Sequence, residues 1–251
     1  MPITAIATIT TIAPIVRFFG FLNLKFVINK MPTTSITTCI ASINSQPKNG
    51  FNTTTSGSAI AMDVRPGPLS RAEEHIAQYG LGEYIETRLS DGLAALGTDE
   101  GDTLVIAGMG GPLMERILTE GRTVRESFQE MILQPQSDIP HFRRFLKMEG
   151  WRIQEERIIR EDGKFYPMMK AVHGEKENFL PGTPYTLSEW FGGMLLERRD
   201  PVLEEYLKRE LRIRDRILEK LQNAPDPGQR LEEVREEKRV ILTALEKYES
   251  I

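Results

Sequence analysis

The sequence has few of the residues that form disulfides and metal sites. Its 251 residues include one cysteine, Cys39, and three histidines that lie far apart, His75, His141 and His173. A single cysteine excludes an internal disulfide, and separated histidines lack the spacing of zinc ligands. We therefore predict no structural metal site. The length of the chain suffices for one α/β domain with a small appendage.

Excess positive charge and long apolar runs are also missing. The formal net charge is −4, so a nucleic-acid partner would need a local basic patch. The apolar run at residues 18–27 is about half as long as the roughly 20 residues that cross a membrane. We therefore expect a chain without a membrane segment.

Acidic residues are absent from the first 62 positions. Asp63 is the first of 36 acids, whereas four basic residues and eleven threonines precede it. A targeting peptide would be acid-poor but also rich in arginine, and this segment has only Arg17. A membrane segment would need a longer apolar run. A third explanation is a start that is translated in the wrong frame.

From residue 59 onward, short apolar runs alternate with amphipathic stretches. Buried strands are predicted at 59–62, 103–107 and 131–133, an alternating strand at 84–89, and helices at 65–79, 112–119 and 140–149. Two further strands, 152–159 and 165–172, are joined by the turn Glu-Asp-Gly at 161–163. This order predicts an α/β fold with a mostly parallel sheet and a closing antiparallel hairpin. Class I methyltransferases have such a hairpin, and ordinary dinucleotide-binding folds do not.

Two charged helices follow residue 181 on either side of a Pro- and Gly-containing turn at 223–228. Their apolar stripes predict an antiparallel helical hairpin, or coiled coil. It could be a structural or dimerisation arm without chemistry. It could also hold RNA, and then the residues to suspect are four arginines: Arg209, Arg212, Arg214 and Arg216.

The ends of the predicted strands carry the candidate binding residues, because ligands of open parallel sheets bind at the carboxyl ends of the strands. Asp63 could accept the two hydroxyl groups of a ribose or could cap a helix. Asp91 and Gly92 could lie beside an adenine or form only a turn. The run from Ala107 through Gly108, Met109 and Gly110 to Gly111 leaves bare backbone that a flat ligand could approach, although close packing could explain one of its glycines.

Three further residues are candidates for contact with a substrate base. Gln134 and Pro135 end a buried strand, where the polar amide of Gln134 could bond the edge of a base or belong to an ordinary loop. Tyr166, on the closing hairpin, could stack on a base or lie in the core.

These motifs, in this order and spacing, resemble the bacterial tRNA (adenine-22-N1)-methyltransferase family. The resemblance covers residues 59–251 and is most specific in Ile-Ala-Gly-Met-Gly-Gly at 106–111. It implies a Rossmann-like class I methyltransferase sheet at 59–182 and a coiled-coil domain at 183–251. It also implies a cytoplasmic enzyme that uses S-adenosylmethionine to methylate N1 of a tRNA adenine. Asp63 would then bind the ribose, Asp91 and Gly92 the cofactor's adenine, and the turn at 107–111 the methionine end.

Residues 1–58 depart from the family pattern. The family has a strand ending in Asp-Ile-Gly-Ser/Thr-Asp-His about 25 residues before the ribose-binding acid, and that position here, 38–42, has neither glycine nor acid. We expect an atypical segment that lacks the central strand, and therefore weak cofactor binding and turnover. The hypothesis is out-of-frame translation or a wrong gene start over residues 1 to about 58, which translation of the other two frames would test. The alternative is an impaired RNA-binding or dimerisation module on the same fold.

Overall fold

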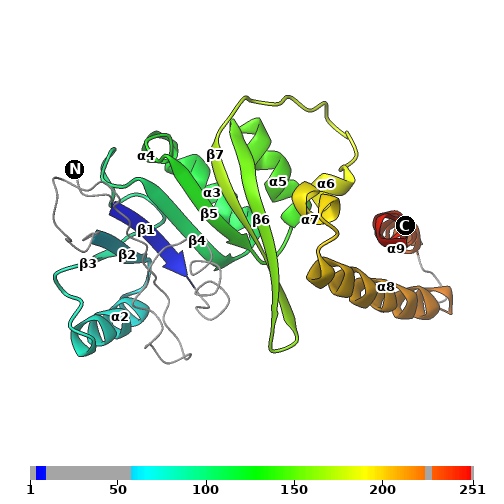
Figure 1. Ribbon diagram of the computed structural model, residues 1–251, viewed down its shortest axis with the longest axis horizontal. Coiled ribbons are helices and arrows are strands. Elements are labelled where there is room, and N and C mark those ends of the chain that lie inside the picture. The colour runs from blue at the N-terminus through cyan, green and yellow to red at the C-terminus, as the bar shows by residue number, and fades with distance from the viewer. Residues whose placement is uncertain (1–3, 10–57, 224–227, 250–251) are drawn as a thin grey trace. The chain divides into compact units, whose positions relative to one another are not determined.

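The computed structural model describes residues 4–9, 58–223 and 228–249 (Figure 1). The chain divides into two compact units, and each is described here by itself. The first comprises Met1–Arg157 and Tyr166–Phe179, and the second comprises Ile158–Phe165 and Leu180–Ile251.

The first unit is built on a seven-stranded sheet with the order β3-β2-β1-β4-β5-β7-β6. Its strands are β1 (Thr4–Ile9), β2 (Ser58–Asp63), β3 (Ile85–Leu89), β4 (Thr103–Met109), β5 (Glu130–Pro135), β6 (Trp151–Glu161) and β7 (Lys164–His173). The first five strands are parallel, and β7 pairs antiparallel with β5. Within the predicted hairpin turn at 161–163, Asp162 and Gly163 both have positive φ, 48° and 74°, as the central residues of a two-residue turn require. The predicted fold class is confirmed.

Helices pack on the sheet because alternate side chains of the central strands point to opposite faces. The helices are α2 (Pro66–Gln78), α3 (Gly111–Glu120), α4 (Arg122–Arg125) and α5 (Ile139–Met148). Ile60 and Met62 belong to the main core, which also contains residues of α3 and α5. Ala61 instead packs with Ile76 of α2. Figure 1 shows α2 beside β2 and β3, whereas α3 and α5 lie together.

A strand forms inside the segment that the sequence analysis expected to lack one. β1 lies between β2 and β4, with Ala5 opposite Ala59 and Thr103. The expectation of a missing central strand is therefore wrong. The expectation was based on the family's spacing, which puts the end of the central strand about 25 residues before Asp63. The strand β1, Thr4–Ile9, lies much earlier in the chain. The positions compared with the family pattern, 38–42, lie outside the described residues.

The second unit contains two short helices and a long helical pair. They are α6 (Leu187–Phe191), α7 (Gly193–Glu197), α8 (Pro201–Gln222) and α9 (Gly228–Glu249). Thr186 and Glu189 form a reciprocal capping box at the start of α6. The Asp200 carboxylate accepts from the backbone N–H groups of Val202 and Leu203 at the start of α8. The core includes Leu203 and Leu207 of α8 with Ile241 and Ala244 of α9.

An ion pair between a buried arginine and a partly exposed glutamate in the first unit should make the stability of this unit depend on pH. Arg125 is fully buried, and its Nη2 donates to Glu149 Oε2 at 2.8 Å. This hydrogen bond is the main cause of a lowered pKa for Glu149. A folded-state pKa below the unfolded value of about 4.3 stabilises the fold above that pH, and this stabilisation is lost as the pH falls through the folded-state pKa.

We expect Glu149→Gln to remove this part of the pH dependence. Urea titrations at pH 6 and at pH 2 measure the free energy of unfolding. Between pH 6 and pH 2 this free energy should fall more for the parent chain than for the variant. Equal losses in the two proteins would contradict the assignment.

Candidate cofactor and substrate site

The predicted site residues gather at the carboxyl edge of the parallel strands. Asp63 is the last residue of β2 and lies opposite Leu89, the last residue of β3. Gln134 of β5 lies opposite Ala107 of β4. Because β1 lies between β2 and β4, the ends of these two strands stand about 10 Å apart, which is two inter-strand spacings.

Asp63 is a buried acid held in place by its own loop. Its side chain is 5% exposed, and Oδ1 accepts the backbone N–H of Arg65 at 2.8 Å. The apolar strand that precedes it explains its burial, since Ala61 and Met62 are almost completely enclosed. A fixed carboxylate at this position can accept hydrogen bonds from a neutral polyol such as a ribose.

The loop after β3 holds Asp91 and Gly92. Ser90 Oγ donates to the Gly92 carbonyl and accepts from the Ala95 N–H, each at 3.0 Å, which fixes the turn. Gly92 has φ +58°, and a Cβ there would approach Ile117 Cγ2 at 3.2 Å. Asp91 is exposed and bonds Arg116 of α3, with Nη2 to Oδ1 at 3.1 Å, and this bond raises the pKa of Arg116.

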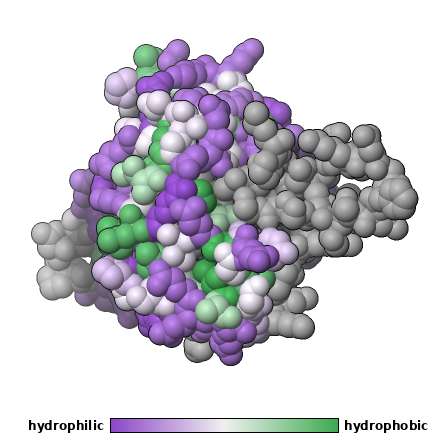
Figure 2. Space-filling view, turned by 90° about the vertical axis from the view of Figure 1, so that its left-hand side faces the viewer, coloured by the Kyte–Doolittle hydropathy of each residue, from purple (hydrophilic) through white to green (hydrophobic). Residues whose placement is uncertain are grey.

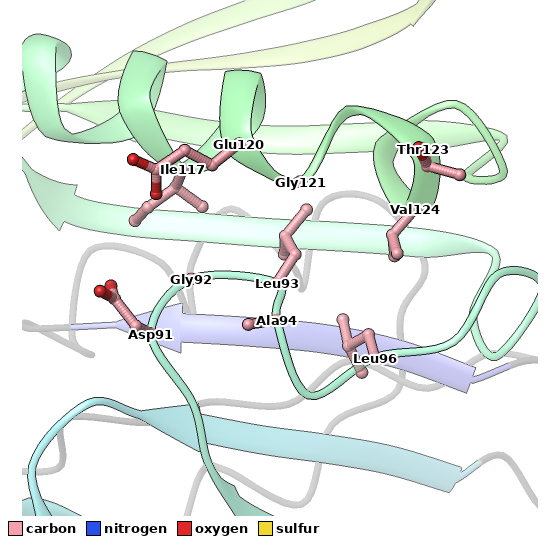
Figure 3. A pocket seen from close by; sticks show the side chains of 10 residues that line it. All are labelled: Asp91, Gly92, Leu93, Ala94, Leu96, Ile117, Glu120, Gly121, Thr123 and Val124. Carbon is pink, nitrogen blue, oxygen red and sulfur yellow. The ribbon is translucent and has the colours of Figure 1, made fainter.

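A pocket of about 280 Å³ lies between this loop and the C-terminal end of α3 (Figure 3). Figure 3 shows Asp91 and Gly92 at one end of it and Leu96 and Val124 at the other. The remaining lining residues are Leu93, Ala94, Ile117, Glu120, Gly121 and Thr123. A mostly apolar pocket lined also by the carboxylates of Asp91 and Glu120 suits a flat, weakly polar ring that carries a hydrogen-bond donor.

The glycine turn after β4 combines an unusual backbone conformation with close packing. Gly108 has φ +75°, where side chains other than glycine are strained. A Cβ on Gly111 would stand 2.7 Å from the backbone oxygen of Ser137, and a Cβ on Gly110 would stand 2.7 Å from Ser137 Oγ. Close packing against backbone therefore requires glycine at Gly111, as expected for one glycine of the turn, whereas the Ser137 side chain that faces Gly110 can rotate.

The three candidates for base contact are all buried. Gln134 is 2% exposed, and its Oε1 accepts the Gly108 N–H at 2.9 Å. Pro135 is buried beside it. Tyr166 is 8% exposed within the core of the sheet, which favours the core alternative over stacking on a base. Direct contact of these residues with a substrate remains a prediction.

The two candidate arginines of the second unit lie on the exposed side of α8. Both Arg209 and Arg212 are exposed, and the Arg209 guanidinium lies over the Phe165 ring at 5.5 Å from its centre. Arg214, by contrast, is half-buried and bonds Glu210 at 2.8 Å and Glu237 at 2.6 Å. Arg209 and Arg212 are therefore exposed on α8, whereas Arg214 is engaged in ion pairs.

Comparison with known proteins identifies the family. The model described as TrmK, tRNA (adenine(22)-N(1))-methyltransferase, matches residues 47–249, which is more than half of the chain. The chain belongs to this family. The tRNA (adenine(22)-N(1))-methyltransferase of Bacillus subtilis strain 168 is 31% identical over 178 residues, covering 71% of this chain and 75% of that protein.

Solved structures agree with this assignment. The crystal structure of the B. subtilis M1A22 tRNA methyltransferase TrmK is 29% identical, with a TM-score of 0.65, over 75% of this chain and 82% of that chain. Streptococcus pneumoniae Sp1610, solved with S-adenosyl-L-methionine, is 31% identical, with a TM-score of 0.65, over 75% and 81%. M. capricolum TrmK with S-adenosyl-homocysteine is 19% identical, with a TM-score of 0.65, over 97% and 92%, and shows a shared fold.

The family membership confirms the resemblance inferred from the motifs. It also confirms the predicted reaction class, S-adenosylmethionine-dependent methylation of N1 of a tRNA adenine. No described helix is both long and apolar enough to cross a membrane. Within the described ranges there is also no cluster of three or more potential metal ligands.

Sequence reasoning missed two interactions of the site. Arg116 bonds Asp91 from 25 positions away, and Gln134 bonds Gly108 from 26 positions away. Arg116 resembles any exposed residue of a charged helix, so no sequence signal distinguished it. Gln134 carried a weak signal, because an amide in a buried strand needs hydrogen-bond partners.

Proposed function

We propose that this chain binds S-adenosylmethionine at the carboxyl edge of its sheet and transfers the methyl group to N1 of adenine 22 in tRNA. The observation that carries the proposal is the placement of Asp63, Asp91 and the Gly108–Gly111 turn at neighbouring ends of one parallel sheet in a member of this family. The residues fit the cofactor: a buried carboxylate suits its ribose, the pocket beside Asp91 and Gly92 suits its adenine, and the turn from Ala107 through Met109 to Gly111 offers bare backbone to its methionine end.

The chemistry needs positioning more than proton transfer. The cofactor supplies an electrophilic methyl group on a sulfonium, whose carbon–sulfur bond breaks as the N1 lone pair of adenine forms the new bond. The positive charge moves from sulfur to the methylated base, and no proton has to leave N1. The task of the protein is therefore to hold donor and acceptor in line and to keep water out. The target adenine must also be exposed from the folded tRNA before it can react.

Methyl transfer to defined transcripts tests the proposal. The full chain is incubated with S-adenosylmethionine and an unmodified tRNA that has adenine at position 22, and the nucleosides are analysed by mass spectrometry. We expect N1-methyladenosine, and none in a transcript with guanine at position 22. Methylation of both transcripts would contradict the site preference. RNA binding without methylation would favour the impaired-module alternative.

We propose that exposed basic residues of α8 hold the tRNA backbone. Arg209, Arg212, Arg216 and Lys220 are all exposed and follow one another at intervals of three, four and four residues. At 3.6 residues per turn they share one face of the helix and span about 16 Å along it. A row of cations of this length suits several consecutive phosphates.

Neutralising two residues of this row should weaken tRNA binding and its dependence on salt. For Arg212→Ala/Arg216→Ala we expect the slope of log affinity against log salt to fall by about 1.5, since each phosphate contact contributes roughly 0.7–0.9. Filter binding between 50 and 300 mM salt measures it.

A matched control is Arg235→Ala/Arg239→Ala on α9. These arginines are also exposed but bond Glu232 and Glu236. An equal effect of both double substitutions would show that total charge, and not the α8 row, determines binding.

We further propose that the enzyme acts in the cytoplasm, where its tRNA substrate is available. The described helices include none that could cross a membrane, and the family modifies tRNA. Fractionation of cells that produce the tagged chain should recover it with the tRNA-containing fraction, and recovery with membranes would contradict this proposal.

A further inference from the structure

Gln134 lies at an irregular point of the sheet. It pairs with Ala107 across the β4–β5 ladder, and the register shifts between Ala107 and Met109, so that Gly108 is skipped. Gly108 also has φ +75°. At such a bulge the backbone N–H of the skipped residue loses its place in the ladder and needs another partner.

The side chain of Gln134 provides that partner. Its Oε1 accepts the Gly108 N–H at 2.9 Å, and its Nε2 donates to the Pro135 carbonyl at 3.2 Å. These two bonds determine which way the amide points, because the acceptor must face the N–H and the donor must face the carbonyl. With 2% exposure, the amide lies beneath the glycine turn and not in the solvent.

The turn is attached to the segment after β5 at two more points. The Gln136 N–H donates to the Met109 carbonyl at 2.8 Å, and the Gly111 N–H donates to the Ser137 carbonyl at 3.0 Å. Both are backbone bonds, which a change of side chain leaves in place. Of these three attachments, the one at Gly108 is made by a side chain, and it lies at the start of the turn.

We propose that Gln134 is a positioning residue for methyl transfer: it acts through the Gly108 N–H to hold the Gly108–Gly111 turn against the bound cofactor. This inference rests on the proposed function, because it takes the turn to border the methionine end of S-adenosylmethionine. It replaces direct reading of the base by Gln134, since the amide is 2% exposed and one donor and one acceptor position already bond within the protein.

The test compares three substitutions. Gln134→Met keeps the length of the side chain and removes both amide bonds. Gln134→Glu keeps an acceptor for the Gly108 N–H but loses the donor to Pro135. Gln136→Met is the matched control, because Gln136 is exposed in the same loop and its attachment to Met109 uses the backbone.

For Gln134→Met we expect about tenfold weaker binding of S-adenosylmethionine by calorimetry and about tenfold lower kcat. The KM for tRNA should stay within twofold, and amide hydrogen exchange at Gly108 should become faster. Gln134→Glu should restore slow exchange at Gly108 and part of kcat, and Gln136→Met should behave like the parent chain. Circular dichroism verifies that each variant is folded. Should Gln134→Met fail to fold, Gln134→Glu decides: slow exchange at Gly108 with part of the parent kcat supports the inference, and fast exchange at Gly108 with the full parent kcat overturns it.

Two outcomes would overturn the inference alone. One is a raised KM for tRNA with unchanged exchange at Gly108, which would indicate direct contact with the base. The other is a parent chain that is active while Gln134→Met is indistinguishable from it. A parent chain that neither binds S-adenosylmethionine nor methylates tRNA would instead overturn the proposed function, and the inference with it.

Discussion

Replacing Asp63 by alanine should weaken binding of S-adenosylmethionine by about 100-fold. In the proposed site the carboxylate accepts both ribose hydroxyls, and each hydrogen bond to a charged group is worth about 1.5–3 kcal/mol. Water partly replaces the two lost hydrogen bonds, so the net loss of binding free energy is about 3 kcal/mol. This loss corresponds to a factor of about 100 in Kd. Isothermal titration calorimetry with the full chain measures it directly.

Two further variants separate loss of the ribose contact from damage to the loop. Asp63→Asn keeps an oxygen that can accept the Arg65 N–H, as Oδ1 does at 2.8 Å, but it loses the charge. We expect an intermediate affinity for this variant. Glu83→Ala removes an exposed acid beyond the other end of β3 and should leave Kd unchanged. If Asp63→Ala binds S-adenosylmethionine as tightly as the parent chain does, the ribose does not bind at Asp63.

Replacing Gly111 by alanine should destabilise the first unit by about 1–3 kcal/mol, the usual cost of overpacking a filled site. The added Cβ would stand 2.7 Å from the Ser137 carbonyl oxygen, 3.3 Å from the Asp138 carbonyl oxygen and 3.4 Å from Phe142 Cβ. Two of these neighbours are backbone atoms, which cannot rotate away. Relief requires a shift of α3 relative to α5, which would also move the glycine turn.

Scanning calorimetry with and without S-adenosylmethionine measures both consequences. We expect a lower Tm for Gly111→Ala, by about 2–4 °C for each kcal/mol, and a smaller rise of Tm on addition of the cofactor. Gly82→Ala is the control, because a Cβ there meets no atom within 4 Å. If Gly111→Ala melts like the parent chain, the α3–α5 contact is more adaptable than its distances indicate.

The local features of this protein could be predicted from the sequence because they depend on neighbouring residues. The apolar run of β2 followed by an acid predicted a strand that ends at Asp63, and the closing hairpin followed from the turn Asp162–Gly163. The two long helices followed from their apolar stripes. Each of these signals depends on side-chain periodicity or turn chemistry within a few residues.

The interactions between distant residues were decided only by the tertiary structure. β1 enters the centre of the sheet through parallel pairing with β2 and β4, which no spacing in the acid-free segment indicated. The Gln134–Gly108 bond depends on a one-residue bulge, and the close approach of Gly111 to Ser137 depends on how α3 meets α5. Register and helix packing join residues that lie 26 or more positions apart in the chain, and local periodicity carries no information about either. The sequence alone therefore determined the family, the cofactor and the strand-end residues, and the tertiary structure decided how the glycine turn is held.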